Sequence, residues 1–344
     1  MRILVTGGAG FIGSSFLDMF VRRYPEHRFV NFDALTYAAN LRSLEPVEGA
    51  ANYRFVRGDV TDEAALEAVF ADEHPDVVVH FAAESHVDRS IARPRAFMET
   101  NVLGTFALLE VCRRRWSPGQ GLFHHVSTDE VYGSLGDTGK FTEETRYDPS
   151  SPYSASKAAS DHLVRAYART YGLATRITSC SNNYGPRQFP EKLVPLMILS
   201  AAAGEPLPVY GQGLNVRDWL YVDDHCEAIW ATLERGRIGE TYNVGGNNEV
   251  RNIDLVRTLC ALVAEETGRS QESVEALITF VPDRPGHDLR YAIDAAKIAR
   301  DCGWSPRETF ETGLRKTVRW YLENTRWVDE VRSGEYKKRL VAGQ

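Results

Sequence analysis

The chain has 344 residues, of which 43% are hydrophobic and 25% charged, as expected for a soluble globular protein with one large or two modest domains. Its formal net charge of −7 argues against the basic surface of a nucleic-acid-binding protein. No apolar run approaches the ~20 residues of a membrane span, and the start of the chain lacks a signal-peptide pattern, so no membrane partner is expected.

Cysteine and histidine spacing indicates neither a disulfide framework nor a metal site. The five cysteines include no CxxC pair, as is typical of a protein in the reducing cytoplasm. The nine histidines include one doublet, His124–His125, in an expected apolar strand where metal coordination is not expected.

Short apolar strands alternate with helical patterns through the first half of the chain. The expected strands cover residues 3–5, 29–32, 53–56, 77–81, 122–126 and 174–178, and the expected helices cover 11–23, 63–70, 100–115 and 153–171. This alternation predicts an α/β fold built on a doubly wound parallel (Rossmann) sheet with right-handed crossovers.

The second half is interrupted by prolines and is less regular. A strand–helix unit at 219–234 and a strand at 241–244 are expected to rejoin the sheet, while the rest forms a smaller, interleaved C-terminal α/β substrate domain. The predicted division is 1–183 plus 217–247 for the dinucleotide-binding domain and 184–216 plus 248–344 for the substrate domain. The charged tail from Asp329 to Gln344 is expected to fray.

A glycine loop, Gly7-Gly8-Ala9-Gly10-Phe11-Ile12-Gly13, joins the first strand to the first helix. Glycines let the backbone approach a pyrophosphate, and the helix N-terminus offers unpaired N–H groups. Asp33 follows the next strand, 20 positions beyond Gly13, where a carboxylate binds the ribose hydroxyls and favours NAD over NADP. The alternative is a structural turn with a surface aspartate.

Tyr153 and Lys157 form a YxxxK pair on one face of an expected helix. An ammonium beside the phenol lowers a pKa that is ~10 when unperturbed, so that the tyrosine can act as a base near neutral pH. Thr128 closes the preceding strand and can hydrogen-bond a forming carbonyl oxygen. Alone, the pair would be a weak signal on a surface helix.

Together, the glycine loop, Asp33, Thr128 and the YxxxK pair resemble the extended short-chain dehydrogenase/reductase family, which acts on nucleotide-sugars, over roughly residues 2–320. The adjacent acidic residues Asp129 and Glu130 resemble the branch that dehydrates dTDP-glucose. Further blocks are similar to that branch, among them residues 80–88, 182–186, 191–193 and 284–288. Two positions depart from it: Ser179 stands where arginine is expected, and Arg187 where tyrosine is expected.

The resemblance implies a site built around NAD and the sugar nucleotide. The implied NAD contacts are Gly7, Gly10, Phe11, Ile12, Gly13, Asp33, Ala34, Leu35, Thr36, Asp59, Val60, Phe81, Ala82, Ala83, Ser85, Thr100, Tyr153, Lys157 and Asn183. The implied substrate contacts are Ser85, Thr128, Asn182, Glu191, Lys192, Leu193, Pro208, Val209, Tyr210, Arg217, Asn252, Arg284, His287 and Tyr291.

The implied reaction is oxidation at C4, loss of water across C5 and C6, and return of hydride to C6, with tightly bound NAD regenerated in each turnover. Tyr153 would take the 4-hydroxyl proton, Glu130 the C5 proton, and a neutral Asp129 would protonate the leaving C6 hydroxyl. The sequence alone does not decide which carboxyl is the acid. The family also implies a homodimer through the helices at 100–115 and 153–171.

Two alternatives stay open. One is a related nucleotide-sugar enzyme, namely an epimerase, a decarboxylase or a GDP-mannose dehydratase, against which Asp129 argues. The other is a non-catalytic NAD-binding scaffold, which would have no need of Thr128, Tyr153 and Lys157. The choice of dTDP over UDP and the pathway served are not decided by the residues.

Overall fold

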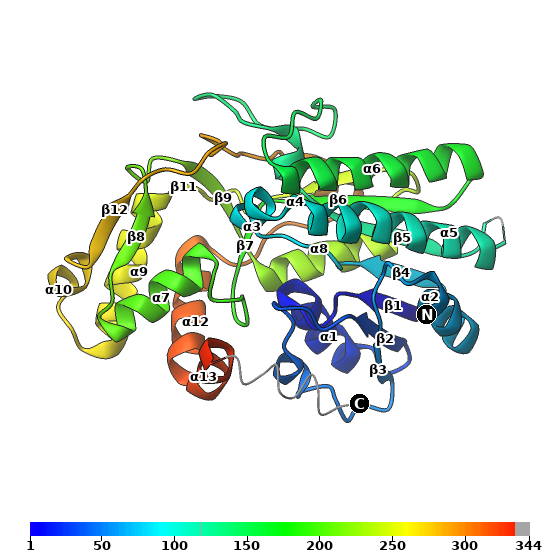
Figure 1. Ribbon diagram of the computed structural model, residues 1–344, viewed down its shortest axis with the longest axis horizontal. Helices are drawn as coiled ribbons and strands as arrows, with labels where there is room; N and C mark the ends of the chain where they lie inside the picture. The colour runs from blue at the N-terminus through cyan, green and yellow to red at the C-terminus, as the bar shows by residue number, and fades with distance from the viewer. Residues whose placement is uncertain (118, 334–344) are drawn as a thin grey trace.

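The computed structural model describes residues 1–117 and 119–333, and its centre is a seven-stranded sheet (Figure 1). The strands are β1 (Arg2–Thr6), β2 (Arg28–Asp33), β3 (Tyr53–Arg57), β4 (Val77–His80), β5 (Leu122–Thr128), β6 (Thr175–Cys180) and β10 (Thr241–Val244). Their spatial order is β10-β6-β5-β4-β1-β2-β3, and every neighbouring pair is parallel. The predicted doubly wound sheet is confirmed.

Helices cover both faces of this sheet, as Figure 1 shows. One layer contains α1 (Phe11–Arg23), α8 (Val222–Arg235) and α11 (Ala296–Cys302), and the other contains α2 (Glu63–Glu73), α5 (Thr105–Arg115) and α6 (Pro152–Tyr171). Successive strand residues point to opposite faces, so Ile3 and Val5 join one buried cluster and Leu4 joins the other. Burial on both faces explains the continuous apolar strands in the sequence.

A smaller region lies at one end of the molecule (Figure 1). It contains a three-stranded sheet of β7 (Asn182–Tyr184), β9 (Val216–Tyr221) and β11 (Glu249–Arg251), and a two-stranded sheet of β8 (Leu207–Tyr210) and β12 (Ile278–Val281). Its helices are α7 (Leu193–Ala203), α9 (Asn252–Thr267), α10 (Gln271–Glu275), α12 (Phe310–Glu323) and α13 (Thr325–Ser333).

Two sequence expectations need correction here. The strand expected at residue 219 does not rejoin the large sheet, because β9 pairs with β7 and β11, whereas β10 takes the edge position beside β6. The tail expected to fray begins as helix, since α13 continues to Ser333; residues 334–344 lie outside the described residues.

The expected helix at 100–115 is regular only from Thr105. It is preceded by α3 (Val87–Ala92), α4 (Pro94–Phe97) and the π-helical segment η2 (Met98–Gly104). The Asn101 side chain in η2 donates to the carbonyl of Glu84 and to Ser156 Oγ, which ties this wide turn to α6 and to the loop after β4. Short 3₁₀ turns, η1 (Leu41–Leu44) and η3 (Asp129–Tyr132), complete the elements.

Within the described ranges, no helix is both long and apolar enough to cross a membrane, and no group of three or more His, Cys, Asp or Glu side chains could hold a metal ion. All five cysteines are buried free thiols.

The fold brings the motifs to the carboxyl ends of the strands. The glycine loop follows β1, Asp33 ends β2, and Thr128 ends β5. The strand order reverses between β1 and β4, and such a switch point is where open α/β sheets bind ligands.

Gly133 provides a test of the turn that follows β5. It has φ +88° and ψ −148°, and a Cβ there would lie 2.5 Å from the carbonyl oxygen of Asp148. Gly133→Ala is expected to lower the free energy of unfolding by about 3 kcal/mol or more, because a conformation open only to glycine is combined with a backbone clash. Gly139→Ala is the matched control, since Gly139 has φ +87° but open space around its Cβ; a loss of about 1 kcal/mol is expected. Urea unfolding measures both, and equal losses would contradict this reading.

Candidate active site

A cavity of ≈ 310 Å³ opens at the carboxyl edge of the large sheet, and most of the predicted cofactor residues line it. Those that line it are Gly7, Gly10, Phe11, Ile12, Gly13, Asp33, Ala34, Thr36, Asp59, Val60, Phe81, Ala82, Ala83, Ser85, Thr100, Tyr153, Lys157 and Asn183. We refer to this cavity as the cleft.

The glycine loop leaves room that any side chain would fill. A Cβ on Gly7, which has φ +72°, would lie 2.6 Å from Ala82 N, and one on Gly13 would lie 2.4 Å from Gly7 O. Helix α1 starts after Gly10 with no side-chain cap and no acidic residue in its first turn. Its first N–H groups therefore remain open to a diphosphate, which fits the predicted dinucleotide.

Asp33 is held by backbone donors at the end of β2. Its Oδ2 accepts from Ala9 N at 2.9 Å and its Oδ1 from Leu35 N at 2.7 Å. Burial raises the pKa of Asp33, while these two hydrogen bonds oppose the rise. The predicted contact Leu35 does not line the cleft: the residue has φ +57°, and its buried side chain packs into the core.

The five predicted catalytic residues all line the cleft. Strand β5 ends at Thr128, and the chain turns at once into η3, where Glu130 N donates to Thr128 Oγ1 at 3.3 Å. Because the strand has ended, Asp129 and Glu130 do not alternate across the sheet, and both reach the same cavity.

The two carboxyl groups differ in their surroundings. Burial raises the pKa of Asp129 well above its usual value, and the nearby Glu130 and Asp218 carboxylates raise it further. Burial also raises the pKa of Glu130, but the positive charges of Lys192, Arg284 and Arg217 oppose that rise. Asp129 is therefore the carboxyl group that holds its proton more firmly.

Helix α6 presents Tyr153 and Lys157 to the cleft. A capping box between Ser151 and Ser154 starts the helix directly before them. The expectation that Lys157 lowers the pKa of Tyr153 is wrong for the protein alone, since burial and the Glu130 charge raise it well above its usual value. The Lys157 ammonium donates instead to Val126 O at 2.8 Å, and burial lowers its pKa to about 8.

The predicted substrate residues fall into three groups. Ser85, Thr128, Asn182, Glu191 and Lys192 line the cleft. Tyr210, Arg217, Arg284, His287 and Tyr291 gather between β8, β9 and the segment from 283 to 291, outside the cleft lining. Leu193, Pro208, Val209 and Asn252 also lie outside it; Val209 is a core residue, and Leu193 packs against the same core.

The second of these groups is cationic and close to the acidic pair. Arg217 is buried, stacks 4.1 Å over the Tyr291 ring and donates to the carbonyls of Val216 and Asp288. Its charge, like that of Arg284, acts on Glu130. The buried Nε of Arg284 has no hydrogen-bond partner, so an anionic ligand fits beside it.

Asp88 connects this cationic group to α3. Its Oδ1 lies 3.3 Å from an Arg284 nitrogen, and its Oδ2 accepts from the Tyr210 hydroxyl at 3.2 Å. The Tyr210 and His287 rings meet edge to face, with centroids 6.1 Å apart.

Glu191, in the cleft lining, connects Tyr37 with Arg89, a link that the sequence did not reveal. Its Oε1 accepts from the Tyr37 hydroxyl at 2.8 Å, and its Oε2 lies 3.2 Å from Arg89 Nε. The Arg89 guanidinium in turn lies 3.6 Å over the Tyr37 ring. Tyr37 and Glu191 are 154 positions apart, so no local pattern could have paired them.

Other lining residues were also missed. They are Phe32, Tyr37, Ala38, Ala39, Gly58, Glu84, Val126, Ser127, Cys180, Ser181, Gln188 and Phe189. Several directly precede or follow a predicted site residue at a strand end, and this adjacency is the signal that could have found them.

The structure shows where the two residues that depart from the expected family pattern, Arg187 and Ser179, lie. Arg187 has φ +71° and forms an ion pair with Asp18 of α1 at 2.7 Å. Ser179 is buried on β6, with the Tyr132 hydroxyl beside its side chain.

Asp33 allows a test of cofactor choice. Asp33→Ser is expected to weaken NAD binding about tenfold or more and to raise the affinity for NADP relative to NAD, because the carboxylate that accepts ribose hydroxyls and repels a 2′-phosphate is lost. Fluorescence titration of cofactor-depleted protein measures both affinities. Asp62→Ser, at the N-cap of α2, removes the same charge and should leave both unchanged. If Asp33→Ser kept the same preference for NAD over NADP, Asp33 would not be part of the cofactor site.

Known proteins share this sequence and architecture. A family model described as GDP-mannose 4,6 dehydratase matches residues 4–317. A dTDP-glucose 4,6-dehydratase from Neisseria meningitidis is 56% identical over 354 residues, covering 100% of this chain and 99% of the relative.

Two crystal structures are similarly close. The dTDP-glucose 4,6-dehydratase of Bacillus anthracis in complex with NAD has a TM-score of 0.87 and 48% identity, covering 96% of this chain and 99% of that one. DesIV, the dTDP-glucose 4,6-dehydratase of Streptomyces venezuelae with NAD and TYD bound, has a TM-score of 0.88 and 48% identity, covering 95% and 98%. Identity at this level over nearly the whole of both chains shows that this chain belongs to the dTDP-glucose 4,6-dehydratase family, within the extended short-chain dehydrogenases/reductases that the glycine loop and the Tyr153–Lys157 pair had indicated.

Proposed function

We propose that this protein is an NAD-dependent hydro-lyase that converts dTDP-glucose to dTDP-4-keto-6-deoxyglucose and water. The observation that carries the proposal is the position of Asp129 and Glu130, side by side in the same cleft as Tyr153 and the glycine loop. Neither an epimerase nor a scaffold needs such a pair, because placing a buried and a partly buried carboxyl group side by side is costly unless they are used.

The residues present fit NAD. The side-chain-free surface of the glycine loop, the open N-terminus of α1 and the acceptor Asp33 would hold the diphosphate and the adenosine ribose. NAD, when bound, supplies an acceptor for the C4 hydride and a donor for C6. Tyr153, Lys157, Thr100 and Asn183 line the same cleft and are proposed to complete its site.

Tyr153 is the proposed base for the 4-hydroxyl of the sugar. Its phenol is buried, and burial together with the Glu130 charge raises its pKa, so a nearby positive charge is needed for it to ionise. Lys157, one helical turn away, is the cation of this chain placed to provide it. Thr128, at the end of β5, is proposed to hold the C4 oxygen as it becomes a carbonyl.

The acidic pair is proposed to carry out the elimination. A ketone at C4 acidifies the C5 hydrogen, and Glu130 takes that proton while Asp129 gives its own to the departing C6 hydroxyl. This order follows from charge: Lys192, Arg284 and Arg217 favour the ionised form of Glu130, whereas burial and two carboxylates keep Asp129 neutral. The structure thus supports an acid–base order that the sequence left open.

The sugar nucleotide is proposed to lie between the cleft and the cationic group of the smaller region. Arg217 and Arg284 suit a diphosphate, and Tyr210, next to Pro208 on β8, suits a wall of the pyrimidine site.

The proposed domains are residues 1–183 with 217–247 for NAD and 184–216 with 248–344 for the nucleotide-sugar. Helix α8 and β10 support the second NAD-binding segment, whereas β9 pairs with the smaller sheet.

A cytoplasmic homodimer is also proposed. Five buried free thiols suit a reducing compartment. Leu103, Phe106 and Tyr171 are exposed beside the helices at 100–115 and 153–171, at 56%, 39% and 53%, and would be covered by a second copy. Analytical ultracentrifugation tests this, because a monomer at micromolar concentration would contradict it.

Incubation with nucleotide-sugars tests the activity. With dTDP-glucose, mass spectrometry is expected to show a product lighter by one water, about 18 Da, together with the absorbance of a 4-keto sugar in base. Turnover of GDP-mannose or a UDP-sugar without turnover of dTDP-glucose would favour a related nucleotide-sugar enzyme instead. Tight NAD binding without any turnover would favour the scaffold.

Two variants separate the steps. Asp129→Asn is expected to accumulate a 4-keto sugar that retains its C6 hydroxyl, because the acid is lost but Tyr153 remains. Tyr153→Phe is expected to form no ketone, with kcat reduced about 100-fold or more. Quenched-flow mass spectrometry distinguishes the two species. Normal elimination by Asp129→Asn would refute the role of Asp129 as the acid.

A further inference from the structure

The histidine doublet of β5 divides between two environments. His124 and His125 are both fully buried and point to opposite faces of the sheet. His124 Nε2 meets Thr178 Oγ1 at 3.1 Å, away from the cleft. His125 Nε2 lies 3.4 Å from Lys157 Nζ and 3.3 Å from Asp161 Oδ1, so this ring contacts both a cation and an anion.

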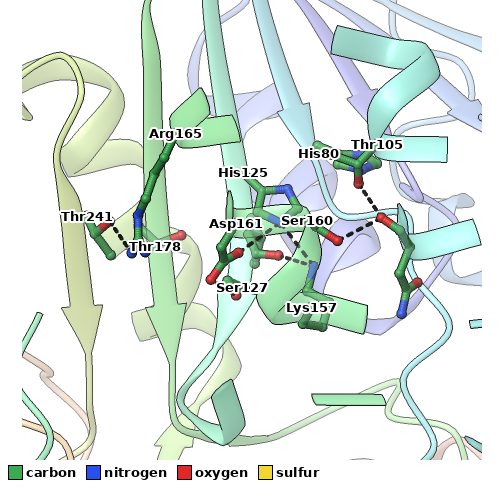
Figure 2. Close-up of polar contacts among 12 residues, drawn as sticks. His80, Thr105, His125, Ser127, Lys157, Ser160, Asp161, Arg165, Thr178 and Thr241 are labelled. Atoms are coloured by element: carbon green, nitrogen blue, oxygen red, sulfur yellow. Dashed lines mark hydrogen bonds and ion pairs between the residues drawn. The ribbon is translucent and has the colours of Figure 1, made fainter. Parts of the chain in front are cut away.

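Asp161 is a buried carboxylate with its own supports. It lies on α6 one turn after Lys157, and neither the proposed chemistry nor the cofactor site uses it. Its Oδ2 accepts from Ser127 Oγ at 2.9 Å and from the Tyr147 hydroxyl at 2.8 Å. Figure 2 shows His125, Asp161 and Lys157 together between β5 and α6.

We propose that His125 and Asp161 are positioning residues, which hold the Lys157 ammonium beside Tyr153 and keep it protonated. This inference rests on the proposed function, because Lys157 is assigned there as the cation that lets Tyr153 ionise. An ammonium group without a compensating charge loses its proton when it is buried away from water. Asp161 is the carboxylate that opposes this loss.

The groups around Lys157 agree with this role. From β4 and β5, His80 and His125 face it as neutral rings, since burial lowers the pKa of both, that of His125 to about 4. From β6 the Cys180 thiol faces it, with a pKa that burial raises to about 12. From α6, Asp161 stays ionised: although burial alone would raise its pKa, its hydrogen bonds with His125 and Tyr147 and the charge of Lys157 hold the pKa below its usual value.

A further cation, Arg165, and a neutral ring, His80, lie around the group of Lys157, His125 and Asp161. Arg165 donates to the Tyr147 hydroxyl at 2.7 Å and to Thr241 Oγ1 at 3.1 Å, so a further cation is linked to Asp161 through Tyr147. Figure 2 shows Arg165 beside Thr241. His80 is held between Thr6 Oγ1 and Thr105 Oγ1, at 2.7 and 3.0 Å, and offers Lys157 no charge.

The first test reads the protonation of Lys157 directly. The sequence has only seven lysines, so protein labelled with ¹³C at lysine Cε gives few NMR signals, and Lys157→Met identifies the one from Lys157. In the NAD-loaded protein, Asp161→Asn is expected to lower the titration midpoint of Lys157 by about one pH unit or more. Asp224→Asn is the control: this buried aspartate accepts from Glu308 N, remote from Lys157, and its loss should leave the midpoint unchanged. An unchanged midpoint in Asp161→Asn overturns the proposal.

The second test uses the doublet itself and does not require Asp161→Asn to fold. His125→Gln is expected to lower kcat about tenfold or more with KM changed less than about twofold, because Lys157 loses its position but the substrate site does not. His124→Gln, an equally buried neighbour, should leave both constants within about twofold. Equal effects of the two variants on kcat would mean a purely structural role for His125 and would overturn the proposal.

Absence of wild-type turnover would refute the proposed function instead. The NMR titration, which uses no substrate, would still decide the role of Asp161.

Discussion

The proposed chemistry depends on two adjacent carboxyl groups, the buried Asp129 and the partly buried Glu130, that differ in how firmly they hold a proton. A parallel strand normally sends successive side chains to opposite faces, and an acidic pair inside it would be both divided and unsolvated. Strand β5 avoids this by ending at Thr128 and turning through η3, whose close at Gly133 requires a conformation open only to glycine. The cations of the smaller region then act on Glu130 more than on Asp129, and the proposed roles of Glu130 as base and Asp129 as acid rest on this asymmetry.

Lys157 poses the same difficulty as the acidic pair, because burial disfavours a charged group, but its charge is positive. Lys157 is buried, as Asp129 is, and burial works against its charge. Neighbouring charges meet both demands: Lys192 in the cleft lining, with Arg217 and Arg284 outside it, for Glu130, and Asp161 for Lys157. The proposed chemistry therefore draws on the smaller region and on the interior face of α6, although neither is part of the Rossmann sheet.

The sequence predicted the sheet and the core of the site because both rest on local patterns. Apolar runs mark the strands, and the glycine loop, the Thr-Asp-Glu segment and the YxxxK pair are each contiguous or nearly so. The prediction was less complete where partners are distant in the chain. The pairing of β9 with β7 and β11, the Glu191 bridge to Tyr37, and the contact of Asp161 with His125 depend on the tertiary fold. The pKa of Tyr153 was misjudged for a related reason: helical spacing gave its neighbour Lys157 but not the burial that dominates it.

The central claim is that a carboxylate of this chain removes the C5 proton of a transiently oxidised sugar and that water then leaves. Mass spectrometry of the product formed from dTDP-glucose in deuterated water tests it most directly. One deuterium at C5 together with the loss of one water is the predicted result. A dehydrated product without deuterium at C5, or a product that has exchanged but kept all its oxygen atoms, would contradict it.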